Sequence, residues 1–273
     1  YEANTATKII EDFMLLANET VASEYFWQEI PFLYRVHDTP DPEKIQALAE
    51  FIRNFGYGLK GVQDEVHPKE LQKLLSRVAD SPEEALISRL TLRSMKQARY
   101  STECSGHFGL AAKYYTHFTS PIRRYPDLQI HRIIKENLRG RLNAERIAHY
   151  QEILPEVAEH SSKTERRADE AERDTDKMKK AEYMLQHIGE EYEGVISSIT
   201  PWGMYVALPN TTEGMIHDAN HYADRYYYNE NTHEMVGSDL GKVYKLGQSI
   251  RVRVLDADKE NATIDFVPAA IWG

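Results

Sequence analysis

The sequence predicts an α+β chain, with a mostly α-helical part over residues 1–188 and a small β-domain over residues 189–268. Two features of the pattern predict this division. Apolar residues recur at helical spacing through the first part, and several of its segments open with proline. After Gly189 the chain consists of short runs rich in Val, Ile, Tyr and Thr, separated by turn residues. With 41% hydrophobic residues, 273 residues can fill one large core or two modest ones.

Composition restricts the class of protein. The apolar runs fall short of the ~18 to 20 residues that a membrane span requires, so we expect no membrane partner. Cys104 is the only cysteine, which excludes an internal disulfide and a cysteine-based zinc site and favours the cytoplasm. The chain begins at Tyr1 without Met or a leader, and we expect a cut end. The net charge of -10 argues against a uniformly basic surface, although an acidic balance is also ordinary in soluble enzymes.

Residues 5–29 are predicted to form an amphipathic helix. Its apolar residues recur at helical spacing and are expected to be buried: Ile9, Ile10, Phe13, Leu16, Ala17 and Val21. At about 100° per residue, Glu11 points away from this stripe, and Asn18 falls on the same side as Glu11. We therefore expect Glu11 and Asn18 to share a polar surface, with a merely solvated Glu11 as the alternative.

Strand, turn and helix patterns follow in turn. β-branched and aromatic residues predict a strand over residues 30–37, which a proline-rich turn ends. Residues 100–110 are polar and contain glycine, so we expect a loop there. Helices are predicted over residues 42–54, from residue 67, over residues 81–98 and from residue 126.

A long, charged helix is predicted to end the first part. Residues 162–165 (Ser-Lys-Thr-Glu) have the pattern of a capping box, so the helix is expected to begin there and to reach about Ile188. Its apolar stripe is narrow and consists mostly of small residues, which let another backbone approach or leave room for a ligand: Ala168, Ala171, Met178, Ala181 and Leu185.

Two adjacent arginines, Arg123 and Arg124, stand just ahead of a proline-initiated helix. Unpaired backbone N–H groups and the helix dipole favour an anion at such a position. A guanidinium group can hold two phosphate oxygens at once, and Thr119 and Ser120 add hydroxyl donors. The segment therefore outlines a phosphate site. The open alternative is that the arginines pair with carboxylates such as Asp127 and only fix a loop.

Three separated stretches resemble the RNB family of exoribonucleases, which includes ribonucleases II and R. The stretch Thr119-Ser120-Pro121-Ile122-Arg123-Arg124-Tyr125 resembles the family signature. Residues 4–18 resemble the family's central helix, and residues 165–174 resemble the last helix of its catalytic domain. The resemblance identifies residues 1–188 as the C-terminal part of an RNB catalytic domain. It implies a processive 3′-to-5′ exoribonuclease that hydrolyses single-stranded RNA to nucleoside 5′-monophosphates.

By position, the resemblance also implies catalytic and RNA-binding residues. Arg123 would clamp the scissile or the adjacent phosphate, and Glu11 and Glu172 would lie near the 3′ end of the RNA. Glu170 is the alternative to Glu172, and a salt-bridge ladder along the helix is the structural alternative for Glu172. The other RNA contacts implied in this part are His107, Phe108, Thr119, Ser120, Arg124 and Tyr125.

The chain departs from the family at its metal site. The family holds two Mg²⁺ ions on an aspartate cluster, but no Asp-x-Asp-Asp run occurs in these 273 residues. Dispersed acids cannot supply converging oxygen ligands of near-octahedral geometry. We therefore expect the Mg²⁺ ligands upstream and none in this chain, which alone would not hydrolyse RNA. A non-catalytic RNA-binding protein is the alternative function, and a scaffold role for the helical part is a third.

The β-domain resembles an S1-type OB-fold, which implies a five-stranded β-barrel that binds RNA. The resemblance rests on residues 194–206 and 213–217. Trp202, Tyr205 and His217 can present flat rings on one face, and base stacking contributes ~1 to 3 kcal/mol per base. We therefore expect single-stranded RNA as the partner. We also expect the complete protein to be a monomer.

Basic residues of the β-domain are expected to follow the phosphate backbone, and Arg251 is the chosen RNA contact among them. The others are Lys242, Lys245 and Arg253, while Thr263 stands where the family often has a basic residue. Tyr226, Tyr227 and Tyr228 either extend the aromatic face or belong to the core.

Overall fold

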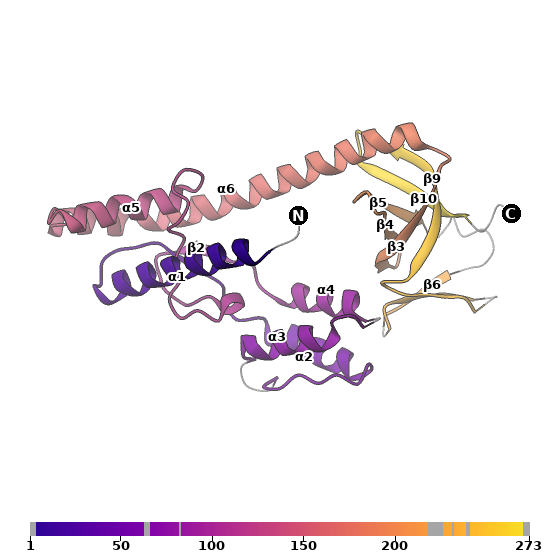
Figure 1. Ribbon diagram of the computed structural model, residues 1–273, viewed down its shortest axis with the longest axis horizontal. Coiled ribbons are helices and arrows are strands. Elements are labelled where there is room, and N and C mark those ends of the chain that lie inside the picture. The colour runs from indigo at the N-terminus through magenta and orange to yellow at the C-terminus, as the bar shows by residue number, and fades with distance from the viewer. Residues whose placement is uncertain are drawn as a thin grey trace. The chain divides into compact units, whose positions relative to one another are not determined.

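The computed structural model describes residues 4–62, 66–81, 83–217, 226–230, 232–238 and 241–269 (Figure 1). The chain divides into two compact units. The first contains Tyr1–Ala47, Leu59–Gln72 and Arg93–Ala168; the second contains Leu48–Gly58, Lys73–Leu92 and Asp169–Gly273. Within the described ranges, no helix has the length and apolar character needed to cross a bilayer. The expected domain division at residues 188 and 189 stays a prediction.

The order of elements confirms the α+β class, with helices first and the main sheet last. The helices are α1 (Thr5–Trp27), α2 (Pro42–Arg53), α3 (Pro68–Val78), α4 (Glu84–Ser94), α5 (Tyr125–Leu138), α6 (Ala144–Met184) and the short 3₁₀ turns η1 (Phe108–Leu110) and η2 (Leu185–His187). The strands are β1 (Tyr34–Val36), β2 (Arg99–Ser101), β3 (Glu191–Thr200), β4 (Gly203–Ala207), β5 (Glu213–His217), β6 (Tyr226–Asn229), β7 (Glu234–Gly237), β8 (Val243–Tyr244), β9 (Ser249–Asp258) and β10 (Thr263–Pro268).

The core of the first unit joins α1, β1, β2, α5 and the first half of α6. Aromatic packing is prominent in it, since the rings of Tyr25 and Phe32 stack with centroids 4.8 Å apart. Ile130 and Ile133 of α5 and Leu154 of α6 are fully buried in the same core. The expected loop over residues 100–110 is wrong at its start, because β2 pairs antiparallel with β1 there. The sequence pattern missed β2 because a three-residue strand offers no period to detect.

Helix α1 buries a different face from the expected one. Asn4 begins the helix with a capping box in which its side chain accepts a hydrogen bond from the Thr7 N–H. The buried residues lie in the second half: Asn18, Ala22 and Tyr25. Four residues of the predicted stripe are 48 to 65% exposed: Ile9, Ile10, Phe13 and Leu16. The prediction of a buried stripe there is wrong, because periodicity identifies an apolar face but not whether anything covers it.

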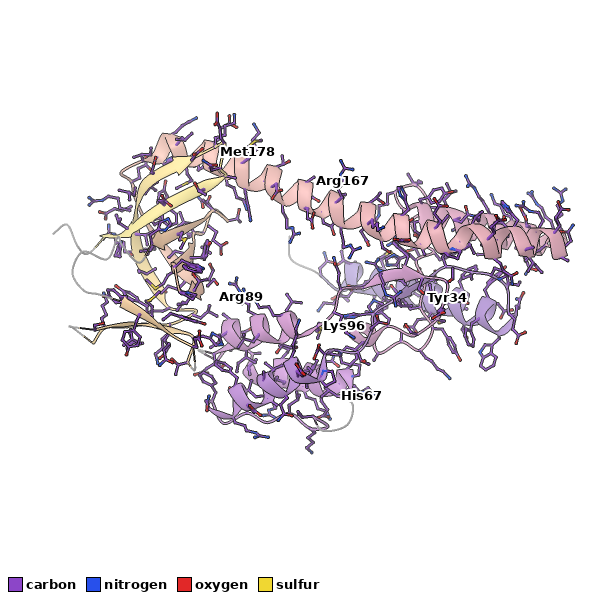
Figure 2. All side chains as sticks on the ribbon, turned by 180° about the vertical axis from the view of Figure 1, so that it is seen from behind. Tyr34, His67, Arg89, Lys96, Arg167 and Met178 are labelled. Atoms are coloured by element: carbon purple, nitrogen blue, oxygen red, sulfur yellow. The ribbon has the colours of Figure 1, made fainter. Side chains whose placement is uncertain are left out.

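Helix α6 is one continuous helix of 41 residues. The predicted capping box at residues 162–165 is wrong, because the Ser162 hydroxyl instead donates to the Ala158 carbonyl one turn earlier. Tyr150 and Leu154 are buried in the first unit, and Ala181 and Met184 are buried in the second. Every residue from 166 to 177 is exposed; Figure 2 labels Arg167 near the start of this stretch and Met178 just after its end. Ala168 and Ala171 of the predicted stripe therefore cover nothing within the described structure.

Five strands of the second unit close into a barrel in the order β10-β5-β4-β3-β9, which confirms the expected five-stranded barrel. Alternate residues such as Met204, Val206 and Ile216 fill its interior. Gly203, at φ +143°, begins β4 opposite His217, and a Cβ there would lie 2.1 Å from the Ile216 carbonyl oxygen. Strands β6, β7 and β8 form a separate antiparallel sheet.

Candidate nucleic-acid interface

A buried ion pair fixes the segment that carries the two arginines. Asp127, in the first turn of α5, is completely buried and accepts a hydrogen bond from Arg124 Nη2 at 2.7 Å. Its Oδ2 also accepts the Ser120 backbone N–H at 2.8 Å. The alternative reading, in which arginine pairs with Asp127, therefore holds for Arg124. Its Nε has no partner among the described residues, so this side chain keeps one unused donor.

Arg123 is arranged differently from its neighbour. Its backbone N–H donates to the Ser120 carbonyl in a tight turn, and its side chain is exposed. Within the described part of the chain it forms no ion pair. The loop that Asp127 holds thus presents a free guanidinium group at the start of α5, where the helix dipole also favours an anion.

The other predicted contacts of this segment differ in accessibility. Thr119 and Ser120 are partly buried beside the turn, and Tyr125 is 50% exposed with its hydroxyl donating to Gln129 Oε1. His107 caps η1 by accepting the Leu110 N–H, and its ring lies 5.1 Å from that of His37. Phe108 is buried. Tyr125 therefore offers a ring surface to a ligand, whereas Phe108 does not in this conformation.

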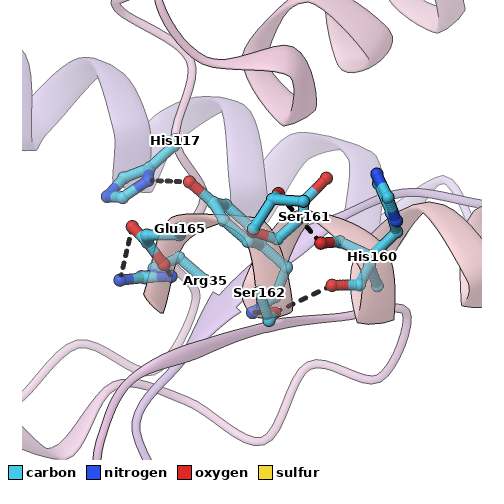
Figure 3. A network of polar contacts seen from close by, with 9 residues as sticks. Arg35, His117, His160, Ser161, Ser162 and Glu165 are labelled. Atoms are coloured by element: carbon cyan, nitrogen blue, oxygen red, sulfur yellow. Dashed lines mark hydrogen bonds and ion pairs between the residues drawn. The ribbon is translucent and has the colours of Figure 1, made fainter. Parts of the chain in front are cut away.

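A polar network that the sequence did not indicate includes His117, two residues before Thr119 (Figure 3). Arg35 of β1 forms two hydrogen bonds to Glu165 of α6, at 2.7 and 3.1 Å, and its guanidinium lies 4.7 Å from the centre of the Tyr100 ring. The Tyr100 hydroxyl is 2.9 Å from His117 Nδ1. The Tyr100 backbone N–H donates to Ser162 Oγ, which ties β2 to α6.

Asn18 of α1 also holds the chain just ahead of the arginine segment. Its Nδ2 donates to the Tyr115 hydroxyl at 3.1 Å, and its Oδ1 accepts the Phe118 N–H at 2.9 Å. Asn18 is 4% exposed, so the expectation of a polar surface shared with Glu11 is wrong. A buried side-chain amide needs hydrogen-bond partners. Asn18 finds them in Tyr115 and Phe118, and these two bonds anchor the loop that leads to Thr119.

His117 and Tyr100 are both held neutral. Burial, followed by the charge of Arg124, lowers the pKa of His117 to about 3, and burial raises the pKa of Tyr100 to about 12. Burial likewise lowers the pKa of His107 to about 4. His107 and His117 therefore add no positive charge at neutral pH, and the charge beside this loop comes from the arginines.

The lowered pKa of His117 predicts a loss of stability in acid. The unfolded state binds this proton near pH 6.5 and the folded state only near pH 3, so its contribution is complete above pH 6.5 and declines as the pH falls. At pH 5 the loss should be about 2 kcal/mol. Urea unfolding of the wild type and of His117→Asn at pH 7.5 and pH 5 measures it. Equal pH dependence in the two proteins would contradict this.

The two predicted catalytic glutamates are exposed. Glu11 lies on the open half of α1 and Glu172 on the open stretch of α6, in different units. Neither forms an ion pair with a described residue, and the same holds for Glu170, so the salt-bridge alternative for Glu172 finds no support. Across the described ranges, no three His, Cys, Asp or Glu side chains lie close enough together to hold a metal ion.

The barrel brings the predicted aromatic residues to one face. Tyr205 on β4 and His217 on β5 both point outward, and Trp202, in the turn before β4, is 73% exposed. His217 Nε2 is 3.0 Å from Asp265 Oδ1 on β10, a partner that the sequence did not indicate. Because Gly203 lies directly opposite His217, the close approach of β4 and β5 places Trp202 beside this face.

The basic residues of the barrel are less free than expected. Arg251 and Arg253 on β9 both pair with Glu191, at 3.2 and 2.6 Å. Lys245 pairs with Glu234, and Lys242 lies over the Tyr244 ring. Tyr226 and Tyr228 pack against the barrel core, whereas Tyr227 is 53% exposed. These pairings reduce the positive charge available to a phosphate backbone at this end of the chain.

Comparison with known families defines the class of protein: an RNB domain matches residues 1–140, and an S1 RNA binding domain matches residues 186–267. The chain belongs to the RNB family. It is 46% identical over 261 residues to Ribonuclease R 1 of Lactococcus lactis and 46% identical over 265 residues to Ribonuclease R of Thermotoga maritima. Each match covers 96% of this chain but 32% and 37% of those proteins, so the chain spans about a third of their length.

Solved structures agree with this assignment. The apo form of Mycoplasma genitalium RNase R superposes with a TM-score of 0.88 at 27% identity, covering 98% of this chain and 42% of that one. The same enzyme in complex with ribose methylated single-stranded RNA gives a TM-score of 0.88 at 28% identity, with the same coverage.

Proposed function

We propose that this chain is the C-terminal part of a processive, Mg²⁺-dependent 3′-to-5′ exoribonuclease that hydrolyses single-stranded RNA to nucleoside 5′-monophosphates. This chain would contribute a phosphate clamp at Arg123 and an RNA-binding face on the barrel. Relatives that are named ribonuclease R and the likeness to an RNase R bound to single-stranded RNA support this function. We expect the complete protein to act as a monomer in the cytoplasm.

The observation that carries the proposal is the contrast between the two arginines. Arg124 is tied to Asp127, whereas Arg123 extends from the same turn without an ion-pair partner among the described residues. A fixed loop with one free guanidinium group at a helix start is suited to holding a phosphate in one position. Glu11 and Glu172 are proposed to lie near the RNA 3′ end.

The 273 residues alone are proposed not to hydrolyse RNA. Mg²⁺ needs several converging oxygen ligands, and we place these in a part of the complete protein outside this chain. The test compares the chain with the complete protein on uniformly labelled single-stranded RNA in the presence of Mg²⁺. We expect mononucleotide release from the complete protein only, and none when the RNA 3′ end is blocked. Release by the chain alone would refute the division of roles.

A non-catalytic RNA-binding protein is the second candidate. The structure of yeast Ssd1, a pseudonuclease, shares the fold with a TM-score of 0.66 at 22% identity. The fold therefore does not establish catalysis. If the complete protein binds single-stranded RNA but releases no mononucleotide from either RNA end, the second candidate replaces the first.

Trp202→Ala is expected to weaken single-stranded RNA binding by about 1 to 3 kcal/mol, because an exposed ring that stacks on a base is lost. Fluorescence anisotropy with a labelled oligouridylate measures this. Trp202→Phe is the matched control, since it keeps a flat ring that can stack on a base and should retain most of the affinity. Unchanged affinity in Trp202→Ala would remove Trp202 from the site.

A further inference from the structure

A second candidate binding site lies in the first unit, away from the arginine segment. It is a cavity of about 890 Å³ among the end of α1, β1, the residues after β2 and the first half of α6. Its size lies within the range of about 300 to 1,000 Å³ that is usual for ligand sites. Phe32, Tyr34 and Leu154 give it a buried apolar floor. No residue between 117 and 128 lines it, so it is separate from the proposed phosphate clamp.

Three aromatic rings among the residues that line this cavity form a cluster. The Phe26 ring contacts those of Trp27 and Tyr114, with centroids 5.5 and 4.7 Å away, and the Trp27 and Tyr114 centroids are 6.2 Å apart. Trp27 is 69% exposed, an unusual position for so large an apolar side chain. The ammonium group of Lys113 lies 5.2 Å from the Tyr114 centroid. One ring of the cluster thus already holds a cation, and tryptophan binds cations better than tyrosine does.

The polar groups around the rings are mostly acceptors. Glu29 and Glu103 line the cavity, are exposed and have no ion-pair partner within the described ranges. Lys113 is the one basic residue of the described lining. Two carboxylates without described ion-pair partners, against one lysine, favour a cation over a phosphate.

We propose that this cavity binds a peptide segment of a partner protein in which an arginine or lysine follows an apolar residue. The apolar side chain enters the cavity above Phe32 and Leu154. The cationic side chain then lies against the free face of Trp27, within reach of Glu29 and Glu103. Charge complementarity selects this occupant over single-stranded RNA, because unpaired carboxylates repel a phosphate backbone.

The experiment titrates the complete protein with a fluorescein-labelled peptide of the sequence Leu-Arg-Pro-Leu-Arg, followed by anisotropy. We expect saturable binding that weakens as salt is raised, and no binding of the matched peptide Leu-Glu-Pro-Leu-Glu. Trp27→Ala should weaken binding at least tenfold, and the double variant Glu29→Gln, Glu103→Gln at least fivefold. Because all three side chains are exposed, these variants are expected to unfold at the wild-type temperature.

The control is Glu156→Gln, which neutralises an exposed carboxylate of α6 that does not line the cavity and should leave peptide affinity unchanged. Equal binding of the two peptides, no binding at millimolar peptide, or unchanged affinity in Trp27→Ala would each overturn the proposal. Displacement of the peptide by an oligouridylate in the Trp202→Ala background would assign the cavity to RNA instead. A peptide affinity that falls with protein self-association would assign it to a second copy of the chain.

Discussion

In the complete protein, Arg123→Ala is expected to lower RNA turnover by about two to four orders of magnitude, which corresponds to about 2.7 to 5.4 kcal/mol of transition-state stabilisation. The reason is that Arg123 is the free charge of the loop, while Arg124 is held by Asp127. Single-turnover measurements on 5′-labelled RNA determine the rate. RNA affinity should change much less, because many other phosphate and base contacts remain.

Two further variants make this result specific. Arg139→Ala removes an exposed arginine at the opposite end of α5 and should leave turnover near the wild-type value. Arg123→Lys keeps the charge but loses the planar fork, so it should restore only part of the rate. If Arg123→Ala turns over RNA at nearly the normal rate, the phosphate clamp is not at Arg123.

Asp127→Ala is expected to cost about 3 to 5 kcal/mol of folding stability, because it leaves the Arg124 charge buried without its partner. The same change frees the Ser120 N–H, so the loop before α5 loses both of its contacts to that carboxylate. Urea unfolding of the chain measures the loss. Turnover of the complete protein should also fall, since Arg123 is then presented by a loose loop.

The double variant Arg124→Met, Asp127→Leu separates ion pairing from packing. Replacing both charges removes the buried unpaired group, so it should recover part of the stability that Asp127→Ala loses. Asp169→Ala, at an exposed position of α6, is the control and should change stability by less than about 0.5 kcal/mol. A loss below about 1 kcal/mol in Asp127→Ala would mean that the pair contributes little to the fold.

The sequence predicted the barrel well because strand signals there are local. Along β4 and β5, side chains alternate between the barrel interior and its surface, and turns bound each strand. Only one pairing register keeps the apolar side chains inside. The aromatic face was predictable for the same reason, since Tyr205 and His217 occupy outward positions of neighbouring strands. The partner of His217 was not predictable, because Asp265 is 48 residues away along the chain.

The supporting residues of the arginine segment escaped prediction because their contacts are long-range. Arg35 and Glu165 are 130 residues apart, and Asn18 reaches Phe118 across 100 residues. The sequence carries no local sign that Asn18 is buried, because helical periodicity does not report partners so far along the chain. At residue 162 the local rule was misleading, because a serine within a helix can bond to the preceding turn as well as begin a new one.

The exposed stretch of α6 makes one helix uneven in its resistance to opening. Residues 144–163 include side chains that are buried in a core. The helical structure of residues 166–177 depends only on backbone hydrogen bonds and on interactions among exposed side chains. Transient fraying in the middle of the helix therefore costs less than opening at either packed end. Backbone amides of residues 166–177 should exchange with deuterated solvent faster than those of residues 150–162, and the difference should widen as temperature rises.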